Sequence, residues 1–447
     1  MQPREARRRL ARGWEGPHGS SLPYSVIDLP ADVRRAVFAL FGLAVLCVVM
    51  AGLYTNLYLF TGPLGESLPE VSPTSADLTL AFQISAALAV GWALVLVVLA
   101  TPTVAAPLRD SLSRLAASRR VWLVAVGAAG AYTAARFAFT IETIHATLEM
   151  YTDGTALLPF QYRALVPWLV RALVEVAPPL GALDIRALYA PFEALAAVAV
   201  WAAFAYLLRV LGLAPGASRV AALGVFVPLA FNLAAPWRYN PVYFPYDTPS
   251  VAFFTLGLAL LLDGRMRPYY ALFVVATLNR ETTCFLTMAY LALAVGRERP
   301  ARILGHVGAQ LVLWVALKAA LGWLYADNVP LDAEDGALFV TMIGRSARIL
   351  MSVPGLVYVG FVTMGGAAAA ALLLARRAGD ARLARIAWIV PPFLFGMSIV
   401  GEMAEVRIYS ELVPLVAATL VLALRSVVRE AAVRHGVPSS TSDLSLT

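Results

Sequence analysis

Long apolar stretches separated by short polar segments make up most of the chain. About 20 apolar residues cross a bilayer core of about 30 Å as a helix, so the stretches predict about twelve spans. The predicted spans are roughly 37–60, 78–101, 121–140, 187–211, 220–236, 249–262, 269–279, 283–296, 303–325, 354–375, 386–401 and 411–427. Two more segments, about 160–177 and 337–352, are amphipathic and too charged to cross, which predicts helices lying in the outer interface. The pattern predicts an all-α, polytopic transmembrane helical bundle.

Composition agrees with a membrane protein. The 447 residues are 60% hydrophobic and 14% charged, whereas soluble domains are about 45–50% apolar and about 25% charged. Cys47 and Cys284 lie in apolar stretches and give no disulfide framework, and the four scattered histidines give no zinc spacing. Lys318 is the only lysine among the 35 basic residues, and this bias, with abundant alanine, suggests a bacterial source and hence the inner (plasma) membrane.

The arginines orient the predicted bundle. Residues 1–35 are arginine-rich, and the first span is too long for a signal peptide and lacks a cleavage site, so we expect it to be retained. Most other arginines fall on the same side as this tail, which predicts that both termini are cytoplasmic. The net charge of +7 is explained by this asymmetry, so no nucleic-acid partner is expected. We expect one transmembrane domain over 36–430 and a disordered tail over 431–447.

One polar triplet interrupts the apolar run 269–295. Asn279, Arg280 and Glu281 stand at its centre, and charges at membrane depth cost several kcal/mol unless they are partnered, so they mark a functional site. Helix neighbours point about 100° apart, so Arg280 and Glu281 each need a partner from elsewhere. Because both flanks of the run are basic, we predict two short helices with the triplet at their outer tip.

The partners of this triplet are sought among the other predicted outer loops. We expect Arg280 to face a phosphate or Asp247, and Glu281 to hold an arginine such as Arg407 or Arg238. Lys318 lies about two turns inside its span, where snorkelling toward the interface explains it.

An acidic segment follows the third predicted span. Glu142, His145, Glu149 and Asp153 share one helical face. This face is either a solvated loop surface or an acidic site that binds a metal–diphosphate or acts as a general base.

Two aromatic segments carry the next candidates. Arg163, within 159–171, either grips a lipid phosphate or anchors an interfacial helix. Arg238, Tyr246 and Asp247 lie in an aromatic loop that suits a sugar or lipid head group. The alternative is an aromatic belt in which Asp247 caps the next helix.

A late loop carries the last cluster. Glu405 and Arg407 lie between the last two predicted spans, together with Glu402 and Glu411. This loop is a natural partner for the triplet, either as an ion-pair network that pins helix ends or as part of a catalytic site.

This arrangement resembles the GT-C class of membrane glycosyltransferases over about 120–427. The matching features are the acidic segment Glu142–Asp153 after a span, the interfacial segment Phe160–Arg171, the aromatic loop Tyr243–Asp247 and the late loop with Glu405 and Arg407. The motifs Phe-Gln-Tyr-Arg-Ala-Leu-Val-Pro, Tyr-Asp-Thr-Pro, Leu-Asn-Arg-Glu-Thr and Glu-Val-Arg-Ile-Tyr-Ser-Glu also resemble uncharacterised bacterial membrane proteins of this general kind. In the GT-C class an acidic residue in an early outer loop is essential and follows the first span. Here the acidic segment follows the third predicted span, so either two spans were added at the N-terminus or the analogy fails. No Asp-x-Asp is present.

The resemblance implies transfer of a sugar from a polyprenyl-phosphate donor to an acceptor on the extracytoplasmic face. Asp153 or Glu142 would deprotonate the acceptor or hold a divalent cation, Mg²⁺ or Mn²⁺, and Arg163 and Arg280 would stabilise the leaving phosphate. The expected partners are membrane lipid and the lipid-linked donor.

A second function class stays open. Short broken helices near a polar site also occur in secondary transporters and lipid flippases, and a non-enzymatic membrane protein is the third alternative. A transporter needs a polar path to both faces, whereas the polar residues here gather on one face, which favours one-sided chemistry.

Overall fold

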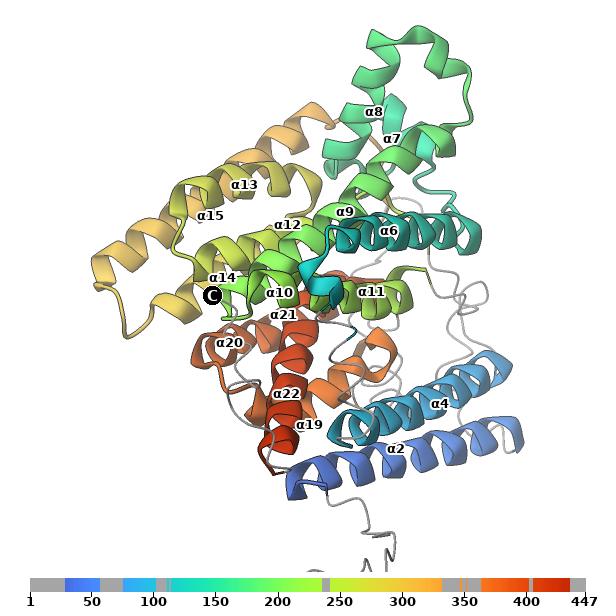
Figure 1. Ribbon diagram of the computed structural model, residues 1–447. Coiled ribbons are helices and arrows are strands. Elements are labelled where there is room, and N and C mark those ends of the chain that lie inside the picture. Colours follow the sequence, from blue (N-terminus) through green and yellow to red (C-terminus); the bar gives the residue numbers. More distant parts are fainter. Residues whose placement is uncertain are drawn as a thin grey trace, which may run out of the picture.

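The computed structural model describes residues 29–56, 75–101, 111, 114–234, 242–331, 346–347, 351, 363–401 and 405–434. Throughout these ranges the regular structure is helical, and extended segments meet only at three isolated β-bridges. Figure 1 shows the helices stacked in a bundle. The prediction of an all-α protein is therefore confirmed.

The α-helices, in chain order, are α2 (Ala31–Asn56), α4 (Ser75–Ala100), α6 (Arg120–Phe139), α7 (Leu148–Asp153), α8 (Leu165–Val176), α9 (Ile185–Val210), α10 (Pro215–Ala222), α11 (Phe226–Leu233), α12 (Asp247–Leu262), α13 (Met266–Asn279), α14 (Cys284–Ala294), α15 (Pro300–Leu324), α19 (Ala367–Ala378), α20 (Ala381–Ile386), α21 (Val390–Val400) and α22 (Val413–Arg434). Short 3₁₀ turns join several of them: η1 (Phe160–Tyr162), η2 (Pro178–Ala182), η3 (Leu223–Val225), η4 (Glu281–Thr283), η5 (Thr363–Gly366), η6 (Ala387–Ile389) and η7 (Val406–Leu412).

In the described part of the chain, 6 helices are long and apolar enough to cross a membrane. They are Arg120–Phe139, Ile185–Val210, Pro215–Leu233, Pro300–Leu324, Ala381–Val400 and Val406–Glu430. Shorter apolar helices include Asp247–Leu262 and Glu281–Ala294. The chain is thus a multi-pass helical protein by length and composition, and the number of twelve spans stays a prediction.

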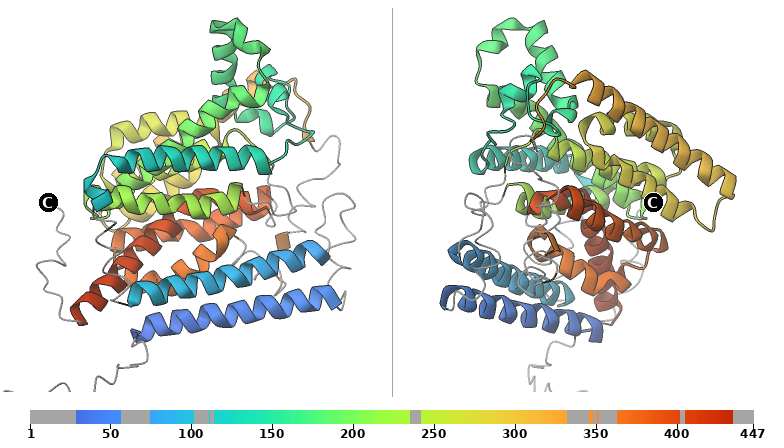
Figure 2. Two further views of the ribbon diagram at one scale, coloured as in Figure 1. Left: turned by 45° about the vertical axis from the view of Figure 1, so that its right-hand side comes forward. Right: turned by 180° about the vertical axis from the view of Figure 1, so that it is seen from behind.

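The core forms where α9 packs between α6, α10 and α12. Trp201 and Phe204 of α9 and Phe254 of α12 are buried there. The apolar side chains of α9 fill nearly its whole circumference, and Leu195, which is 67% exposed, lies on the side that no other described helix covers. The pair α2 and α4 lies along one side of the bundle, and α19 packs against α22 (Figure 2).

The predicted break in the run 269–295 is confirmed. Helix α13 ends at Asn279, and Arg280 is extended with φ −159° and ψ 144° before η4 and α14 begin. Tyr270 near the start of α13 and Tyr290 near the end of α14 both contact the ring of His306. The start of α13 and the end of α14 therefore lie at the same end of the bundle.

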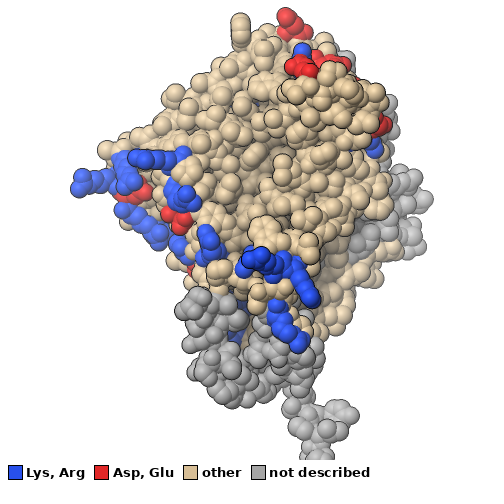
Figure 3. Space-filling model, turned by 45° about the horizontal axis from the view of Figure 1, so that its top comes forward, with Lys and Arg blue, Asp and Glu red and all other residues tan. Residues whose placement is uncertain are grey.

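Arginines define one end of the bundle. Arg382 donates to the carbonyl of Val210 at the end of α9, and Arg425 donates to the carbonyl of Gly212 just beyond it. Arg385 donates to the carbonyl of Val295, just beyond the end of α14. Cations at helix C-termini satisfy otherwise unpaired carbonyls. Figure 3 shows basic side chains gathered on one side of the molecule. We call the region around these carbonyls the basic end.

The start of α2 and the end of α22 meet at Arg377 of α19. Arg377 pairs with Asp32 near the start of α2 and, at 3.0 Å, with Glu430 near the end of α22. Since Arg425 of α22 also reaches the basic end, both described ends of the chain lie there. This geometry agrees with the predicted common side of the termini, and their cytoplasmic location stays a prediction.

At the opposite end, called the far end, α7 and α8 stand apart from the bundle (Figure 1). The segment predicted to lie in the interface, 160–177, forms η1 and α8. Val166 and Val170 of α8 are buried, whereas Arg171 is exposed, as expected of an amphipathic helix. Nearly all of the second predicted interfacial segment, 337–352, lies outside the described residues.

Candidate functional site: a buried charge cluster

Arg136 is a fully buried guanidinium on α6. Its Nε lies 3.0 Å from Glu193 Oε1 on α9, and its Nη2 lies 3.3 Å from Asp247 Oδ2 at the start of α12. The same Nη2 donates to the carbonyl of Phe244 at 2.9 Å. A buried charge is tolerated only when it is paired and hydrogen-bonded, and Arg136 meets this condition by joining three segments.

The carboxylate of Glu193 is buried within α9, one of the helices long and apolar enough to cross a membrane. Thr248 Oγ1 donates to Glu193 Oε1 at 2.5 Å, and the Tyr243 hydroxyl donates to Oε2 at 3.5 Å. Tyr132 of α6 shares a 2.8 Å hydrogen bond with the same threonine hydroxyl. These contacts tie α6, α9 and α12 together around one carboxylate.

Asp247 lies among three arginines. Its Oδ1 is 3.3 Å from Arg280 Nη1 and 3.9 Å from Arg407 Nη1, and its Oδ2 faces Arg136. The prediction that Arg280 faces Asp247 is confirmed. The alternative that Asp247 caps α12 is wrong: the helix begins at Asp247 itself, Tyr246 occupies the cap position, and the carboxylate turns to the arginines.

Arg280 also binds Glu411 of η7. Nη1 of Arg280 lies 2.9 Å from Glu411 Oε1, and Thr282 Oγ1 donates to the same oxygen at 2.8 Å. Next to it, the amide of Asn279 donates at 2.9 Å to the carbonyl of Tyr246 and to Ser250 Oγ. The extended backbone at Arg280 lets these side chains reach different helices.

Glu281 has partners that differ from those predicted. Arg163 binds it with two hydrogen bonds, Nη2 to Oε1 at 2.5 Å and Nε to Oε2 at 3.2 Å. Lys318 of α15 lies 3.6 Å from Oε2, an ion pair that the sequence did not predict. The expected pairing of Glu281 with Arg407 is wrong as well, because Arg407 pairs with Glu405 at 2.8 Å. The other expected partner, Arg238, lies outside the described residues.

Aromatic rings line the arginines. The guanidinium carbon of Arg163 lies 4.4 Å from the centre of the Tyr246 ring, and that of Arg407 lies 4.1 Å from the Phe244 ring. The two rings stack on each other with centres 5.2 Å apart. Burial raises the pKa of the Tyr246 phenol, against the opposing effect of Arg163 and Arg407, so the hydroxyl stays protonated while it accepts a hydrogen bond from Arg163.

These ten charged residues form what we call the buried charge cluster: Arg136, Arg163, Glu193, Asp247, Arg280, Glu281, Lys318, Glu405, Arg407 and Glu411. Its cations and carboxylates are equal in number, so the formal charges cancel. Because its members lie on different helices, the cluster joins segments that are far apart in sequence. Breaking one of its buried ion pairs costs about 3–5 kcal/mol, because the other charge is left unpaired.

The cluster has a deep part and an accessible part. Arg136, Glu193 and Asp247 are fully buried, whereas the side chains of Glu281 and Glu405 are 32% and 35% exposed. The second pair is therefore the part of the cluster that solvent can reach. Some polar atoms of the cluster, Arg280 Nε, Lys318 Nζ and Glu411 Oε2, have no hydrogen-bond partner within the described structure.

The structure brings together eight of the residues predicted for the site: Arg163, Tyr246, Asp247, Asn279, Arg280, Glu281, Glu405 and Arg407. These residues come from four separate segments of the chain. We expected the polar residues of the predicted outer loops to lie close together, and these eight residues do.

The two predicted catalytic carboxylates lie elsewhere. Glu142 pairs with Arg186 at 2.7 Å and accepts the backbone N–H of Leu148 at the start of α7. Asp153, at the end of α7, is exposed. Tyr151 of the same helix packs on Tyr246, and a residue two positions along a helix points about 200° away, so Asp153 faces away from the cluster.

His145 precedes α7 and shapes the local turn. Its backbone carbonyl accepts the N–H of Leu157 at 3.1 Å, and its own N–H donates to Thr143 Oγ1 at 3.4 Å. Its role in substrate binding, as predicted from the shared helical face with Glu142, stays a prediction.

Sequence reasoning missed Arg136 and Glu193. Each is a lone charge in the interior of an apolar span, and an ionisable residue at membrane depth is itself a signal of a functional site. Glu411 appeared only as a neighbour of Arg407, whereas the structure pairs it with Arg280.

The carboxylates of the cluster do not suit a divalent cation. In the described part of the chain, no group of three histidine, cysteine or acidic side chains could hold a metal ion. Asp247, Glu281 and Glu411 are each held by cationic side chains instead. The carboxylates of the cluster therefore do not fit Mg²⁺ or Mn²⁺, and a cation held by Asp153 or Glu142 stays a prediction.

Comparison with known proteins gives no match to any family model, curated protein or solved structure.

Proposed function

We propose that the chain is a membrane glycosyltransferase that moves a sugar from a polyprenyl-phosphate donor to an acceptor at the far end of the bundle. The observation that supports this most is the accessible part of the buried charge cluster, where Arg163, Lys318 and Arg407 lie beside the partly exposed Glu281 and Glu405. In this proposal the far end faces the extracytoplasmic side of a bacterial inner membrane.

Arg163 and Arg407 suit the donor phosphate. Arginine binds phosphate and carboxylate with the same two-pronged geometry, so a phosphate can replace Glu281 on Arg163. Both guanidinium groups already lie against aromatic rings, which holds their planes in place and leaves their outer edges for a ligand.

Glu405 is the better candidate for the general base. Glu281 is held by both Arg163 and Lys318, whereas Glu405 has one cationic partner in the described structure, Arg407, and is 35% exposed. A base needs a free lone pair within reach of the acceptor hydroxyl. Glu405 therefore takes the role that the sequence assigned to Asp153 or Glu142.

The reaction balances with these groups. The acceptor hydroxyl gives its proton to Glu405, and its oxygen forms a bond with the anomeric carbon of the sugar. The bond from that carbon to the phosphate oxygen breaks, and the electron pair leaves with the polyprenyl phosphate. Arg163 and Arg407 stabilise the charge that grows on this oxygen.

Asp247, Arg280 and Glu411 act as positioning residues in this proposal. They are buried too deeply to meet the substrate, but they fix the backbone on either side of Glu281 and Arg407. A rigid charged scaffold of this kind keeps a site in its reactive geometry.

The test uses membranes that contain the full chain and radiolabelled polyprenyl-phosphate hexose or pentose as donors. We expect Glu405→Gln to lower transfer at least about 100-fold, the usual contribution of a general base. The matched control Asp153→Asn removes an exposed carboxylate and should keep transfer within about twofold of wild type. Normal transfer by Glu405→Gln would refute the base assignment, and no transfer by wild type from any donor would refute the proposed function.

A secondary transporter or lipid flippase is the second candidate. It is favoured by the broken pair α13 and α14, which places Arg280 and Glu281 between two short helices. Accumulation of a labelled sugar lipid on the opposite leaflet of vesicles, without a new glycosidic bond, would support this candidate over the transferase.

A further inference from the structure

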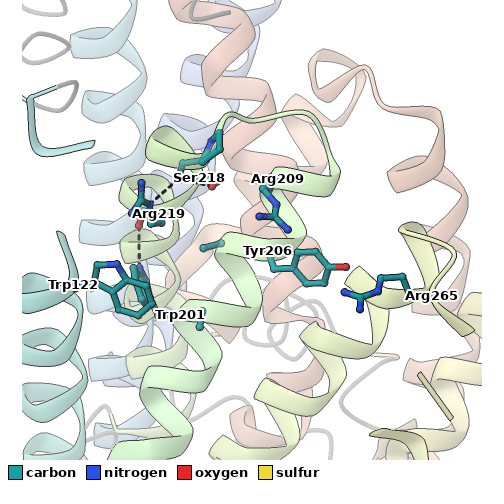
Figure 4. Close-up of a pocket in the computed structure, with 10 residues that line it drawn as sticks. Trp122, Trp201, Tyr206, Arg209, Ser218, Arg219 and Arg265 are labelled. Carbon is teal, nitrogen blue, oxygen red and sulfur yellow. Dashed lines mark hydrogen bonds between the residues drawn. The ribbon is translucent and has the colours of Figure 1, made fainter. Parts of the chain in front are cut away.

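A cavity of about 600 Å³ opens on the basic end, remote from the buried charge cluster. Figure 4 shows the side chains that line it, among them Trp122, Trp201, Tyr206, Arg209, Arg219 and Arg265. Arg209 is 16 positions beyond Glu193 on α9, which is about 24 Å along the helix. We call this the arginine cavity, and it plays no part in the proposed transfer.

The three arginines of the cavity come from separate elements. Arg209 lies in the last turn of α9, Arg219 in α10, and Arg265 directly before α13. Their guanidinium groups lie around one hollow (Figure 4). Three cations brought together from three elements repel each other, and Asp263, which binds the Tyr206 hydroxyl, offsets only part of their charge.

These arginines differ from several others at the basic end. Arg382, Arg385 and Arg425 are used on the carbonyls of helix ends, and Arg377 pairs with carboxylates. By contrast, the described structure gives none of the three cavity arginines an ion pair with a carboxylate.

The contacts of these arginines leave donors free. Arg209 lies over the Tyr206 ring at 5.2 Å, and Arg219 Nε donates to the Pro215 carbonyl at 3.0 Å. The Tyr206 hydroxyl itself donates to Asp263 at 2.5 Å, which fixes the ring under Arg209. Guanidinium groups carry five N–H donors each, so most donors of the cavity are open to a ligand.

Tryptophans form the wall on the side of α6. Trp122 packs edge-on against Trp201 with ring centres 4.6 Å apart, and the Trp201 Nε1 donates to the carbonyl of Arg219 at 2.9 Å. Trp122 is 46% exposed, and Leu123 and Val126 beside it on α6 are also exposed. Tryptophan favours the boundary between head groups and acyl chains of a bilayer.

We propose that the arginine cavity binds the head group of an anionic phospholipid. The phosphate diester would be held by Arg209, Arg219 and Arg265, and the acyl chains would lie along the exposed apolar face of α6 next to Trp122. A lipid is favoured over a free phosphate because the cationic hollow continues into this apolar face. The volume lies within the range of about 300–1,000 Å³ usual for small-molecule sites.

The test uses the full-length protein in non-ionic detergent, titrated with phosphatidylglycerol or with phosphatidylcholine of the same acyl chains. Bound lipid is counted by mass spectrometry. Arg209→Gln combined with Arg265→Gln removes two charges from the cavity, and Arg297→Gln combined with Arg299→Gln removes two exposed charges from the same end as a control. Inorganic phosphate is added as a competitor in a third arm.

Wild type should bind phosphatidylglycerol at least about tenfold tighter than phosphatidylcholine, because each arginine near a membrane surface contributes about 1 kcal/mol. The cavity variant should lose at least about tenfold in phosphatidylglycerol affinity, and the control should stay within about twofold. Equal loss in both variants, or equal binding of the two lipids, would overturn the proposal. Displacement by millimolar phosphate would overturn the lipid assignment in favour of a soluble anion.

A second measurement does not depend on the folding of the double variant. Phosphatidylglycerol with brominated acyl chains should quench the fluorescence of wild type, and Trp122→Phe should remove part of this quenching. Identical quenching in wild type and Trp122→Phe would place the lipid elsewhere.

Discussion

Arg280 Nη1 lies 3.3 Å from Asp247 Oδ1, although 33 positions separate the two residues in the chain. The pair holds the break between α13 and α14 against the start of α12, and both side chains are almost fully buried. It is the centre of the buried charge cluster, because each partner also binds a charge from another helix: Asp247 meets Arg136, and Arg280 meets Glu411. Stability and site geometry are thus coupled at this pair.

Loss of Asp247 should destabilise the protein strongly. Asp247→Ala leaves Arg136, Arg280 and Arg407 without a shared carboxylate, and we expect a loss of about 3–5 kcal/mol. Thermal unfolding in detergent measures the effect. In a double-mutant cycle with Arg280→Ala, the coupling should exceed about 0.5 kcal/mol. Additive effects of the two substitutions would show that the pair contributes no energy of its own.

Charge reversal tests the contact between Arg163 and Glu281. Either Arg163→Glu or Glu281→Arg alone places like charges about 3 Å apart and should lower the melting temperature and the yield of monodisperse protein. The double reversal should recover much of the loss. Arg171→Glu, at an exposed site whose ion-pair partner among the described residues is Glu175, is the control and should change stability by less than about 1 kcal/mol. Failure of the double reversal to improve on the singles would argue against a direct pair.

Gly257 of α12 tests the packing of α14. A Cβ at this position would lie 2.7 Å from Leu286 Cδ1, and Leu286 is buried. Gly257→Ala should therefore cost about 1–3 kcal/mol through overpacking, and Leu286→Ala in the same chain should relieve part of it. Gly305→Ala in α15 meets no atom within 4 Å and should be neutral or stabilise the helix by about 0.5–1 kcal/mol. Equal effects of the two glycine substitutions would contradict close packing of α12 and α14.

The start of α20 should carry a pH dependence. Burial favours protonation of Asp380, but hydrogen bonds from Arg382 and from the backbone N–H groups of Arg382 and Leu383 outweigh it, so its pKa lies below the usual 3.8. A lowered pKa in the folded state gives stability that is present above the unfolded value and is lost as the pH falls below about 4. Asp380→Asn should lower the melting temperature at pH 7, and its gap to wild type should narrow toward about pH 3.

In the pH series with Asp380→Asn, the control variant is Asp153→Asn. It removes an exposed carboxylate and so makes the same change in net charge. A gap between wild type and Asp380→Asn that stays constant from pH 7 to about pH 3 would show that the ionised carboxylate is not what stabilises the helix start.

The apolar pattern predicted the elements well because helix length and apolar period are local properties. The run 269–295 shows this most clearly. Its polar triplet and basic flanks predicted two short helices, and the structure ends α13 at Asn279 and begins α14 at Cys284. The amphipathic segment that became α8 was found for the same reason, since its apolar and charged positions follow the helical period.

The sequence by itself determined that the protein is all-α, that it is apolar enough to lie in a membrane, where the chain breaks around Arg280, and that Arg280 and Glu281 need separate partners. Only the tertiary structure decided which partners they have. It placed Glu281 on Arg163 and Lys318, turned Asp247 from a helix cap into an acceptor for arginines, and brought Arg136 and Glu193 into the same cluster. The physical reason is that the pairing of buried charges depends on which helices are neighbours and how each is rotated, and no local pattern encodes either.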